Sequence, residues 1–353
     1  MQPSFPLFTE SGPKAESNWR GVVLLGRNVQ SYKFALARSL LDIAASGAIA
    51  VSLEDLALPF AHQLCDHLKL ADKQGSSQSS TFLNACRASN DGECSEEELR
   101  TITIRQGFNN VLDAFHIVGQ DPVPTRFFAV SGTGMNRIVH LTDEAIALAT
   151  GPQAGNLQRE ADARWRLVET AWEIGVSTRV LSTIPITYNE MDELLYVGAG
   201  RRQSITGIRG AISGYQKGRC FYCNRGIDTE AGSPFLADVD HVFPHRLQRV
   251  LSATGPNLDG VWNLALACRD CNRGTGGKSD RLPHRDFLNR LWARNEYYIF
   301  SHHPLRETLI LQTGRNLQQR VDFLNTVWRE ASALGLPSWS PVQVEESVWT
   351  AQP

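Results

Sequence analysis

Four cysteines occur as two Cys-x-x-Cys pairs in the second half of the chain. The pairs are Cys220/Cys223 and Cys268/Cys271. A two-residue knuckle offers two thiolates from one tight turn, and zinc binds four such ligands at the corners of a tetrahedron. Because four protein thiolates leave no open position on the ion, the spacing predicts a structural zinc site rather than a catalytic one. The alternative is four reduced thiols in a protein core.

A second set of side chains, with harder oxygen and nitrogen atoms, lies within and directly after the same segment. Asp240 and His241 are adjacent. Asn263 follows them, and Asn272 comes directly after the fourth cysteine. The oxygen atoms of Asp and Asn suit Mg²⁺ or Mn²⁺, and water and phosphate oxygens complete the coordination. Since a neutral imidazole can accept a proton from an attacking water near neutral pH, the set predicts a metal-dependent nuclease.

The balance of charge also differs along the chain. Of the 35 Lys and Arg and the 37 Asp and Glu, residues 201–300 carry 15 and 9, which leaves 20 and 28 for the remainder. A basic segment in an acidic chain is typical of a protein that binds a polyanion at one face. The alternative is a fluctuation in composition. Five side chains near the motif are candidate phosphate contacts, or else ordinary surface residues: His245, Arg246, Arg273, Lys278 and Arg281.

The motif segment as a whole resembles the HNH endonuclease family, also called the ββα-metal or His-Me finger family. The resemblance rests on four runs: CFYC (220–223), DVDHVFPH (238–245), GVWNLALAC (260–268) and CRDCNRGTGGKSDR (268–281). It implies two antiparallel strands, at residues 236–241 and 261–267, followed by a helix that starts near Arg269. It also implies hydrolysis of a phosphodiester by water, with 5′-phosphate and 3′-hydroxyl products.

The same resemblance implies a role for each residue of the harder set. In the family, the first Asp and the last His or Asn bind the catalytic metal ion, which here makes Asp240 and Asn272 ligands of Mg²⁺ or Mn²⁺. The first His is the general base, here His241. The middle Asn braces the loop that aims this base, here Asn263. The chain departs from the strict pattern by having Asn at the last position, which weakens the expectation of a soft divalent metal.

A weaker resemblance concerns the N-terminal half. The runs GRN (26–28) and SYKFAL (31–36) are similar to N-terminal regions of bacterial HNH proteins in antiphage defence systems, including the Zorya type. This similarity implies protein partners of a defence system and phage or foreign DNA as substrate. Arg27 and Lys33 are then candidate phosphate contacts, and the alternative for both is helix capping and surface charge.

The elements that have to position these residues are mainly helical. Apolar residues recur at helical spacing in residues 32–45, 52–70, 156–181, 284–301 and 316–334. We expect Pro59 to kink or split the second of these helices. Two strands at residues 126–130 and 137–141 predict a hairpin, and the polar stretch 73–98 predicts a solvated loop or a frayed segment.

The predicted fold class is α+β, a mainly helical scaffold with an inserted ββα-metal module that a zinc knuckle pair holds together. The chain is long enough for two or three domains. We expect a mainly helical regulatory or DNA-engaging domain at 1–200 and a nuclease module with structural zinc at 201–285. A C-terminal helical region at 286–353 is expected to pack on the module.

Composition is that of an ordinary globular protein, with 42% hydrophobic and 20% charged residues. No run approaches the ~18 apolar residues of a membrane span, and Met1-Gln2-Pro3 does not open a signal peptide. We therefore expect a cytoplasmic protein with reduced cysteines. The leading hypothesis is a DNA endonuclease or nickase. The alternatives are a non-catalytic zinc-dependent nucleic-acid-binding protein and an RNase of the same fold.

Overall fold

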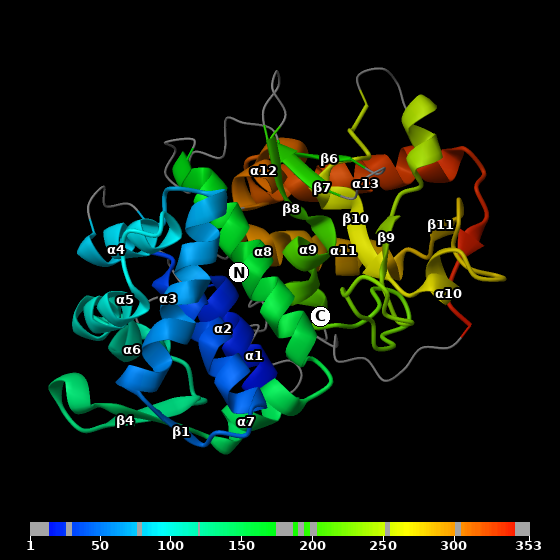
Figure 1. The fold of residues 1–353 in the computed structure, drawn as a ribbon. Coiled ribbons are helices and arrows are strands. Elements are labelled where there is room, and N and C mark those ends of the chain that lie inside the picture. The colour runs from blue at the N-terminus through cyan, green and yellow to red at the C-terminus, as the bar shows by residue number, and fades with distance from the viewer. Residues whose placement is uncertain are drawn as a thin grey trace. The chain divides into compact units, whose positions relative to one another are not determined.

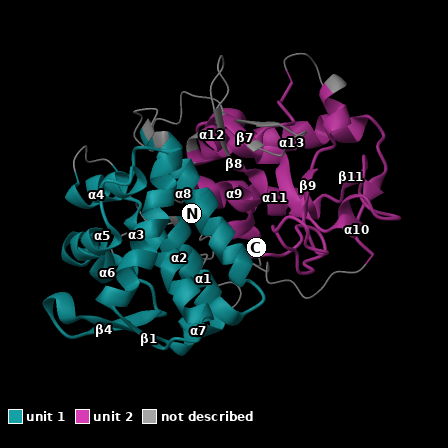
Figure 2. Ribbon diagram, viewed as in Figure 1, with its two compact units in different colours: residues 1–175, 349–353 teal, residues 176–348 magenta. Residues whose placement is uncertain are grey.

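The structure is a computed structural model that describes residues 14–25, 30–75, 80–118, 121–173, 186–189, 194–197, 203–250, 255–300 and 305–342. It divides into two compact units (Figure 1, Figure 2). Unit 1 is Met1–Gly175 with Trp349–Pro353, and unit 2 is Val176–Val348. The helices after residue 285 belong to the same unit as the four cysteines.

Unit 1 consists of helices and small sheets. Its α-helices in the described residues are α1 (Lys14–Arg20), α2 (Tyr32–Ala45), α3 (Leu53–Leu70), α4 (Thr81–Asn90), α5 (Glu96–Ile102), α6 (Val111–Ala114), α7 (Asp143–Thr150) and α8 (Ala154–Glu173). An antiparallel sheet has the order β1 (Ala50–Ser52), β5 (Ile138–Leu141), β4 (Phe128–Ser131), and β2 (Ile117–Val118) pairs with β3 (Asp121–Pro122). The predicted hairpin is therefore confirmed as β4 and β5, with β1 added at one edge.

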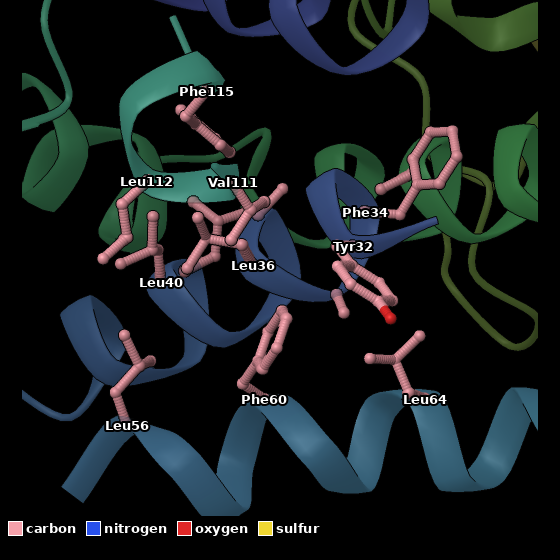
Figure 3. Close-up of a cluster of buried hydrophobic side chains, with 14 of the residues drawn as sticks. Tyr32, Phe34, Leu36, Leu40, Leu56, Phe60, Leu64, Val111, Leu112 and Phe115 are labelled. Carbon is pink, nitrogen blue, oxygen red and sulfur yellow. The ribbon is translucent and has the colours of Figure 1, made fainter. Parts of the chain in front are cut away.

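The core of unit 1 is built on α2 and α3, whose apolar residues fall at helical spacing. Leu36 and Leu40 of α2 and Leu56 and Phe60 of α3 are at most 1% exposed. They belong to one cluster with apolar side chains of α6 and its neighbours (Figure 3). The Phe60 ring lies 4.9 Å from the Phe108 ring. Both predicted helices are confirmed, and their periodic faces are the buried ones.

Pro59 does not split α3. The helix is continuous with the proline inside it, so the expected split at this residue is wrong. Proline removes one backbone N–H from the helix ladder. Leu56 and Phe60 on either side of it are fully buried, and this packing holds the helix together across the missing hydrogen bond.

The polar stretch predicted as a loop is helical in much of its described part, where it contains α4 and the start of α5. Each helix begins at a serine. The side chain of Ser80 accepts a hydrogen bond from the Leu83 backbone N–H, and Ser95 forms a capping box with Glu98. Leu83 is buried. The polar composition that predicted a loop belongs to the exposed faces of two short amphipathic helices.

Unit 2 combines short strands with helices. Its strands in the described residues are β6 (Ile186–Asn189), β7 (Leu194–Val197), β8 (Gln203–Gly207), β9 (Asp238–His241), β10 (Leu264–Ala267), β11 (Leu282–Pro283) and β12 (Ser338–Trp339). Its α-helices there are α9 (Ile208–Gln216), α10 (Arg269–Asn272), α11 (Asp286–Phe300), α12 (Leu305–Thr313) and α13 (Leu317–Ala333). β6, β7 and β8 form one antiparallel sheet, and β11 pairs with β12 in parallel.

β9 and β10 form an antiparallel pair, and α10 follows β10 directly (Figure 1). The predicted order of strand, strand and helix is confirmed. The second strand is shorter than predicted, because residues 261–263 form a 3-10 turn, η7 (Val261–Asn263). The buried guanidinium of Arg294 donates to the Val261 and Trp262 carbonyl oxygens at 3.2 and 2.8 Å. The Arg294 side chain thus supplies these two carbonyl oxygens with hydrogen-bond donors, which in a β-strand would come from a neighbouring strand.

The other predicted helices are also present. α11 and α13 match the periodic segments 284–301 and 316–334. Asn316 caps α13 in a capping box with Gln319. α8 matches residues 156–173 of the predicted 156–181, and the remainder of that segment lies outside the described residues. None of the helices in the described ranges has the length and apolar character needed to cross a membrane.

Candidate metal centre and adjoining histidine site

The four cysteines of the two knuckles come together in unit 2. Their sulfur atoms all lie within 4.8 Å of one another, and all four residues are buried. The Sγ atoms of Cys223 and Cys268 are 3.7 Å apart. A tetrahedral zinc site with Zn–S bonds of about 2.3 Å has S···S edges of about 3.8 Å. The cluster therefore fits a metal ion such as zinc, in agreement with the prediction from spacing.

Each knuckle is shaped by its own backbone. In the first, the Cys220 N–H donates to the Arg225 carbonyl at 2.8 Å. Asn224 closes this turn with φ of +65°, a left-handed conformation that Asn tolerates better than most residues. In the second, Cys268 occupies the N-cap position of α10, so the helix places Cys271 one turn later.

β10 connects the two knuckles. The Phe221 N–H of the first knuckle donates to the Leu266 carbonyl at 2.9 Å. The Gln216 side chain bonds both the N–H and the carbonyl of Leu266, at 2.8 and 2.7 Å. Because β10 leads directly into Cys268, these bonds bring the beginning and the end of the motif to the same place.

The thiols influence one another's ionisation. Hydrogen bonds from Cys220 lower the pKa of Cys223, and they lower the pKa of Cys268 to about 6. Hydrogen bonds within the cluster raise the pKa of Cys220 and of Cys271. Without a cation, the four thiols therefore do not all ionise together. A bound cation would stabilise the negative charges and allow all four sulfurs to be thiolates.

Asp240 is buried and both of its carboxylate oxygens are bonded. The Tyr222 hydroxyl donates to Oδ2, and the Lys278 Nζ lies 3.1 Å from Oδ1. Lys278 is fully buried, and its ammonium also donates to the carbonyl oxygens of His241 and Ser279, at 3.0 and 3.2 Å. Three acceptors satisfy the three N–H bonds of the ammonium group.

This environment does not fit a divalent ion at Asp240. Burial raises the pKa of the carboxyl group, while the charge of Lys278 and the hydrogen bonds from Tyr222 and Lys278 oppose that rise. Burial and the nearby carboxylate together raise the pKa of Tyr222 well above its usual value. An ion at Asp240 would have to displace a buried ammonium that already neutralises the carboxylate.

Asn272 contacts a different aspartate. Its amide Nδ2 donates to Asp238 Oδ2 at 3.2 Å. Asp238 lies two residues before Asp240 on β9, so the two side chains share one face of the strand. Asp238 also pairs with Arg273 at 3.0 Å. The structure therefore joins Asn272 to Asp238, while Asp240 bonds Tyr222 and Lys278.

His241 is the last residue of β9, and a partly exposed aspartate holds its ring. His241 Nε2 lies 3.0 Å from Asp259 Oδ1. The same oxygen lies 3.3 Å from Nε2 of His245, and the two imidazole rings are 5.2 Å apart. The hydrogen bond with His241 is the main cause that lowers the pKa of Asp259.

Asn263 links the two chain segments that carry this pair. It is fully buried. Its Oδ1 accepts from the Phe243 N–H at 2.8 Å, and its Nδ2 donates to the Phe243 carbonyl at 2.9 Å. Nδ2 also donates to the Leu258 carbonyl at 2.9 Å. Because Phe243 follows His241 closely and Leu258 precedes Asp259, one side chain fixes both segments.

Most candidate phosphate contacts of the motif are engaged within the protein. The half-exposed Arg246 lies 4.0 Å from Asp280, and His245 and Arg273 pair with aspartates as described. The Arg281 guanidinium donates to the carbonyl oxygens of Gly276 and Gly277, which holds the loop after α10. Arg246, Arg273 and His245 remain on the surface, where a phosphate can reach them.

Two other candidates are in different surroundings. The full burial of Lys278 removes it from the set of side chains that can reach a phosphate, so that expectation is corrected. In the N-terminal half, Lys33 donates to the Ile117 carbonyl at 3.0 Å, and burial lowers its pKa to about 8. Arg27 lies outside the described residues.

Sequence reasoning missed Tyr222, Asp238 and Asp259. Asp238 had a usable signal, because a strand places residues two apart on the same face. Tyr222 lies between Cys220 and Cys223, and the spacing of the thiols gives no information about which residue its hydroxyl group contacts. Asp259 stands in a turn before Gly260, and nothing in its spacing connects it to His241.

Comparison with protein-family models, with curated proteins and with solved structures found no match to the chain. Three features of unit 2 can therefore indicate a function. They are four buried thiols placed for a metal ion, a buried cluster of Asp240, Lys278 and Tyr222, and a histidine held by a partly exposed carboxylate.

Proposed function

We propose that unit 2 is a phosphodiester hydrolase of the HNH type that cleaves DNA as an endonuclease or nickase, with zinc as the metal of the four-cysteine site. The observation that carries the proposal is the placement of His241. It ends the first strand of a strand–strand–helix unit, bonds Asp259 at 3.0 Å, and lies next to a loop that Asn263 holds. A fixed imidazole with a carboxylate partner is suited to general-base chemistry.

The chain's own residues have separable tasks in this proposal. His241 accepts the proton of the attacking water, and Asn263 keeps the loop after it in place. The zinc site holds the ends of the motif together and takes no part in the chemistry. Arg246, Arg273 and His245 are the proposed phosphate contacts, since they remain partly exposed.

For a catalytic Mg²⁺ or Mn²⁺ ion, the residues that fit are Asp238 and Asn272, which offer hard oxygen atoms and touch each other. Such an ion would neutralise charge on the phosphate. Asp238 is paired with Arg273, whose side chain is 65% exposed. The Asp238 side chain is 13% exposed, but solvent reaches the guanidinium and weakens the attraction, so the arginine can leave at modest cost.

DNA as the substrate and a role in antiphage defence rest on the sequence. The excess of basic residues in 201–300 favours a polyanionic substrate. The defence role rests on the similarity of residues 26–36 to defence-system proteins. An RNase would use the same site, and RNA is therefore a necessary second substrate in any assay.

One observation favours a second candidate, a non-catalytic zinc-dependent nucleic-acid-binding protein. The family resemblance makes Asp240 a metal ligand, but both of its carboxylate oxygens are already bonded, one to Lys278 and the other to Tyr222. A protein that only binds nucleic acid needs the zinc site and the basic surface, and it can use Asp240 as a structural residue.

Relaxation of supercoiled plasmid by the purified protein distinguishes the two candidates. Parallel reactions contain Mg²⁺, Mn²⁺ or EDTA, and matched RNA serves as the second substrate. Zinc content is measured in each sample, because EDTA also removes zinc. We expect metal-dependent nicked or linear DNA, with nicked circles alone indicating a nickase.

Two histidine variants complete the experiment. His241→Ala removes the proposed base, and His284→Ala is the matched control, since His284 is half-exposed and bonds Asp286 at 3.1 Å. Loss of cleavage in the first variant alone supports the proposal. If the folded, zinc-loaded wild type binds DNA without cleaving it under every condition, the binding protein is the better account.

A further inference from the structure

The partner of His241 is a residue outside the motif that suggested the nuclease. Asp259 lies in the turn before η7, and its side chain is 38% exposed, whereas that of His241 is 9% exposed. The 3.0 Å contact therefore joins an almost buried imidazole to a carboxylate at the surface. A carboxylate that accepts from one ring nitrogen determines which nitrogen carries the proton.

The turn that carries Asp259 is held in a defined shape. Its backbone N–H donates to Asn257 Oδ1 at 3.0 Å, and the preceding Leu258 N–H donates to Gln248 Oε1 at 2.6 Å. Gly260 follows, and a Cβ there would lie 2.5 Å from Cδ1 of Trp262, so only glycine fits. These contacts fix the backbone at Asp259.

Asn263 links the two chain segments that carry the pair. Through its bonds to Phe243 and to Leu258 it connects the segment after His241 to the segment before Asp259. Nε2 of His245 lies 3.3 Å from the same Asp259 oxygen, so both imidazoles face one carboxylate oxygen.

We propose that Asp259 is a positioning residue for His241, which it holds in the tautomer with the proton on Nε2 and the lone pair on Nδ1. The inference rests on the proposed function. In the reaction, a water molecule gives a proton to the His241 imidazole, and its oxygen bonds phosphorus. The bond from phosphorus to the 3′ oxygen breaks, and that oxygen takes a proton from solvent. Asp259 stabilises the imidazolium that forms.

Steady-state kinetics of Asp259→Asn and Asp259→Glu test this role. Asn keeps the shape but removes the charge, so we expect kcat to fall by roughly tenfold to a hundredfold. KM should change less than about twofold, because Asp259 acts through His241 and not on the substrate. The longer carboxylate of the Glu variant should restore part of kcat. Asp286→Asn is the matched control, since it removes a carboxylate from another histidine pair.

Imidazole ¹⁵N–¹H correlation spectra of the full-length protein give a readout that needs no activity. The His241 signal is assigned by its loss in His241→Ala. We expect the Nε2–H tautomer in the wild type and a mixture in Asp259→Asn. An unchanged tautomer together with wild-type kcat in that variant would overturn the proposal. If the wild type cleaves nothing, the proposed function fails, while the spectra still decide whether Asp259 sets the tautomer.

Discussion

Each unit contains a histidine that is bonded to carboxylates, His67 in unit 1 and His241 in unit 2, and the two are held in different ways. In unit 1, His67 of α3 bonds Glu169 at 2.7 Å through Nδ1 and Asp162 at 3.1 Å through Nε2, and its ring stacks on Trp165. The Glu169 side chain is fully buried. In unit 2, His241 is held by a carboxylate that solvent can reach. The first arrangement joins helices, whereas the second leaves an acid–base pair near the surface.

The surroundings of the two histidines also differ, because His67 lies beside a mainly apolar core and the surroundings of His241 contain more buried polar groups. The core of unit 1 is a large cluster of apolar side chains that extends from Trp19 to Trp172. The site of unit 2 depends on thiols and on buried polar side chains that bond backbone carbonyls, among them Arg294, Lys278 and Asn263. β9 and β10 have four residues each, and hydrogen bonds from these polar side chains fix the backbone around them.

The largest expected effect is that of metal removal, which should unfold the site and leave unit 1 intact. A four-thiolate zinc site contributes on the order of 10 kcal/mol to the structure that it closes. Chelation or Cys268→Ser should abolish zinc binding and the hydrogen-exchange protection of β9 and β10. The helices of unit 1 should keep their protection. Cys94→Ser, a change of a thiol in unit 1, is the control. Equal loss in both units, or a protein without zinc, would contradict the comparison.

Asp240→Asn and Asp238→Asn separate a structural aspartate from an ion ligand. The first leaves the Lys278 ammonium buried without its counter-charge, so we expect unit 2 to lose about 3–5 kcal/mol of unfolding free energy. The second removes an ion pair whose arginine is in solvent and should change that free energy by only about 1 kcal/mol. It should instead raise the Mg²⁺ concentration needed for cleavage. Urea unfolding and metal titrations measure both quantities, and the reverse pattern would restore Asp240 as the ligand.

Arg294→Met tests the polar anchors directly. The guanidinium is buried and donates to the carbonyl oxygens of Leu264, Val261 and Trp262. Its removal takes three charge-assisted hydrogen bonds from these carbonyl groups, and we expect a loss of about 3 kcal/mol in unit 2. Arg329→Met, an exposed arginine of α13, is the control. If both variants unfold at the same urea concentration, buried arginine is not what holds η7.

The effect of His67→Gln on the stability of unit 1 should depend on pH. Burial disfavours the imidazolium, but the hydrogen bonds with Asp162 and Glu169 outweigh it and raise the pKa of His67. A raised pKa means that stabilisation is complete below the unfolded pKa of about 6.5 and is lost as pH rises through the folded value. The variant should therefore lose about 2 kcal/mol near pH 6 and progressively less at higher pH.

The control for that prediction is His62→Gln, since His62 is half-exposed and lies 3.9 Å from Glu96. Urea unfolding of unit 1 between pH 5.5 and 9 measures the difference for both variants. A difference for His67→Gln that grows with pH would show that the imidazole is neutral in the folded protein, which would contradict the ion-pair account.

The sequence predicted those parts of the structure that depend on local chemistry. Helical spacing was enough for α13, and the thiol spacing was enough for the metal cluster. The helices α4 and α5 were missed because their polar composition resembles a loop, although Ser80 and Ser95 were visible as caps.

The partners within the site could not be predicted in the same way. Lys278 reaches Asp240 from the loop beyond α10, and Tyr222 reaches it from the first knuckle. Such contacts depend on tertiary packing and produce no periodic pattern in the amino-acid sequence. Asp238 and Asp240 are both on one face of β9, and only the packed structure shows which of them meets Asn272.

The central claim is that His241 acts as a base within a metal-held site. Its most direct test is single-turnover cleavage of a labelled DNA duplex by wild type and His241→Gln at equal zinc content and equal unfolding midpoint. We predict a rate reduced by at least about a hundredfold in the variant. Equal cleavage by both proteins, or none by the folded, zinc-loaded wild type, would contradict the claim.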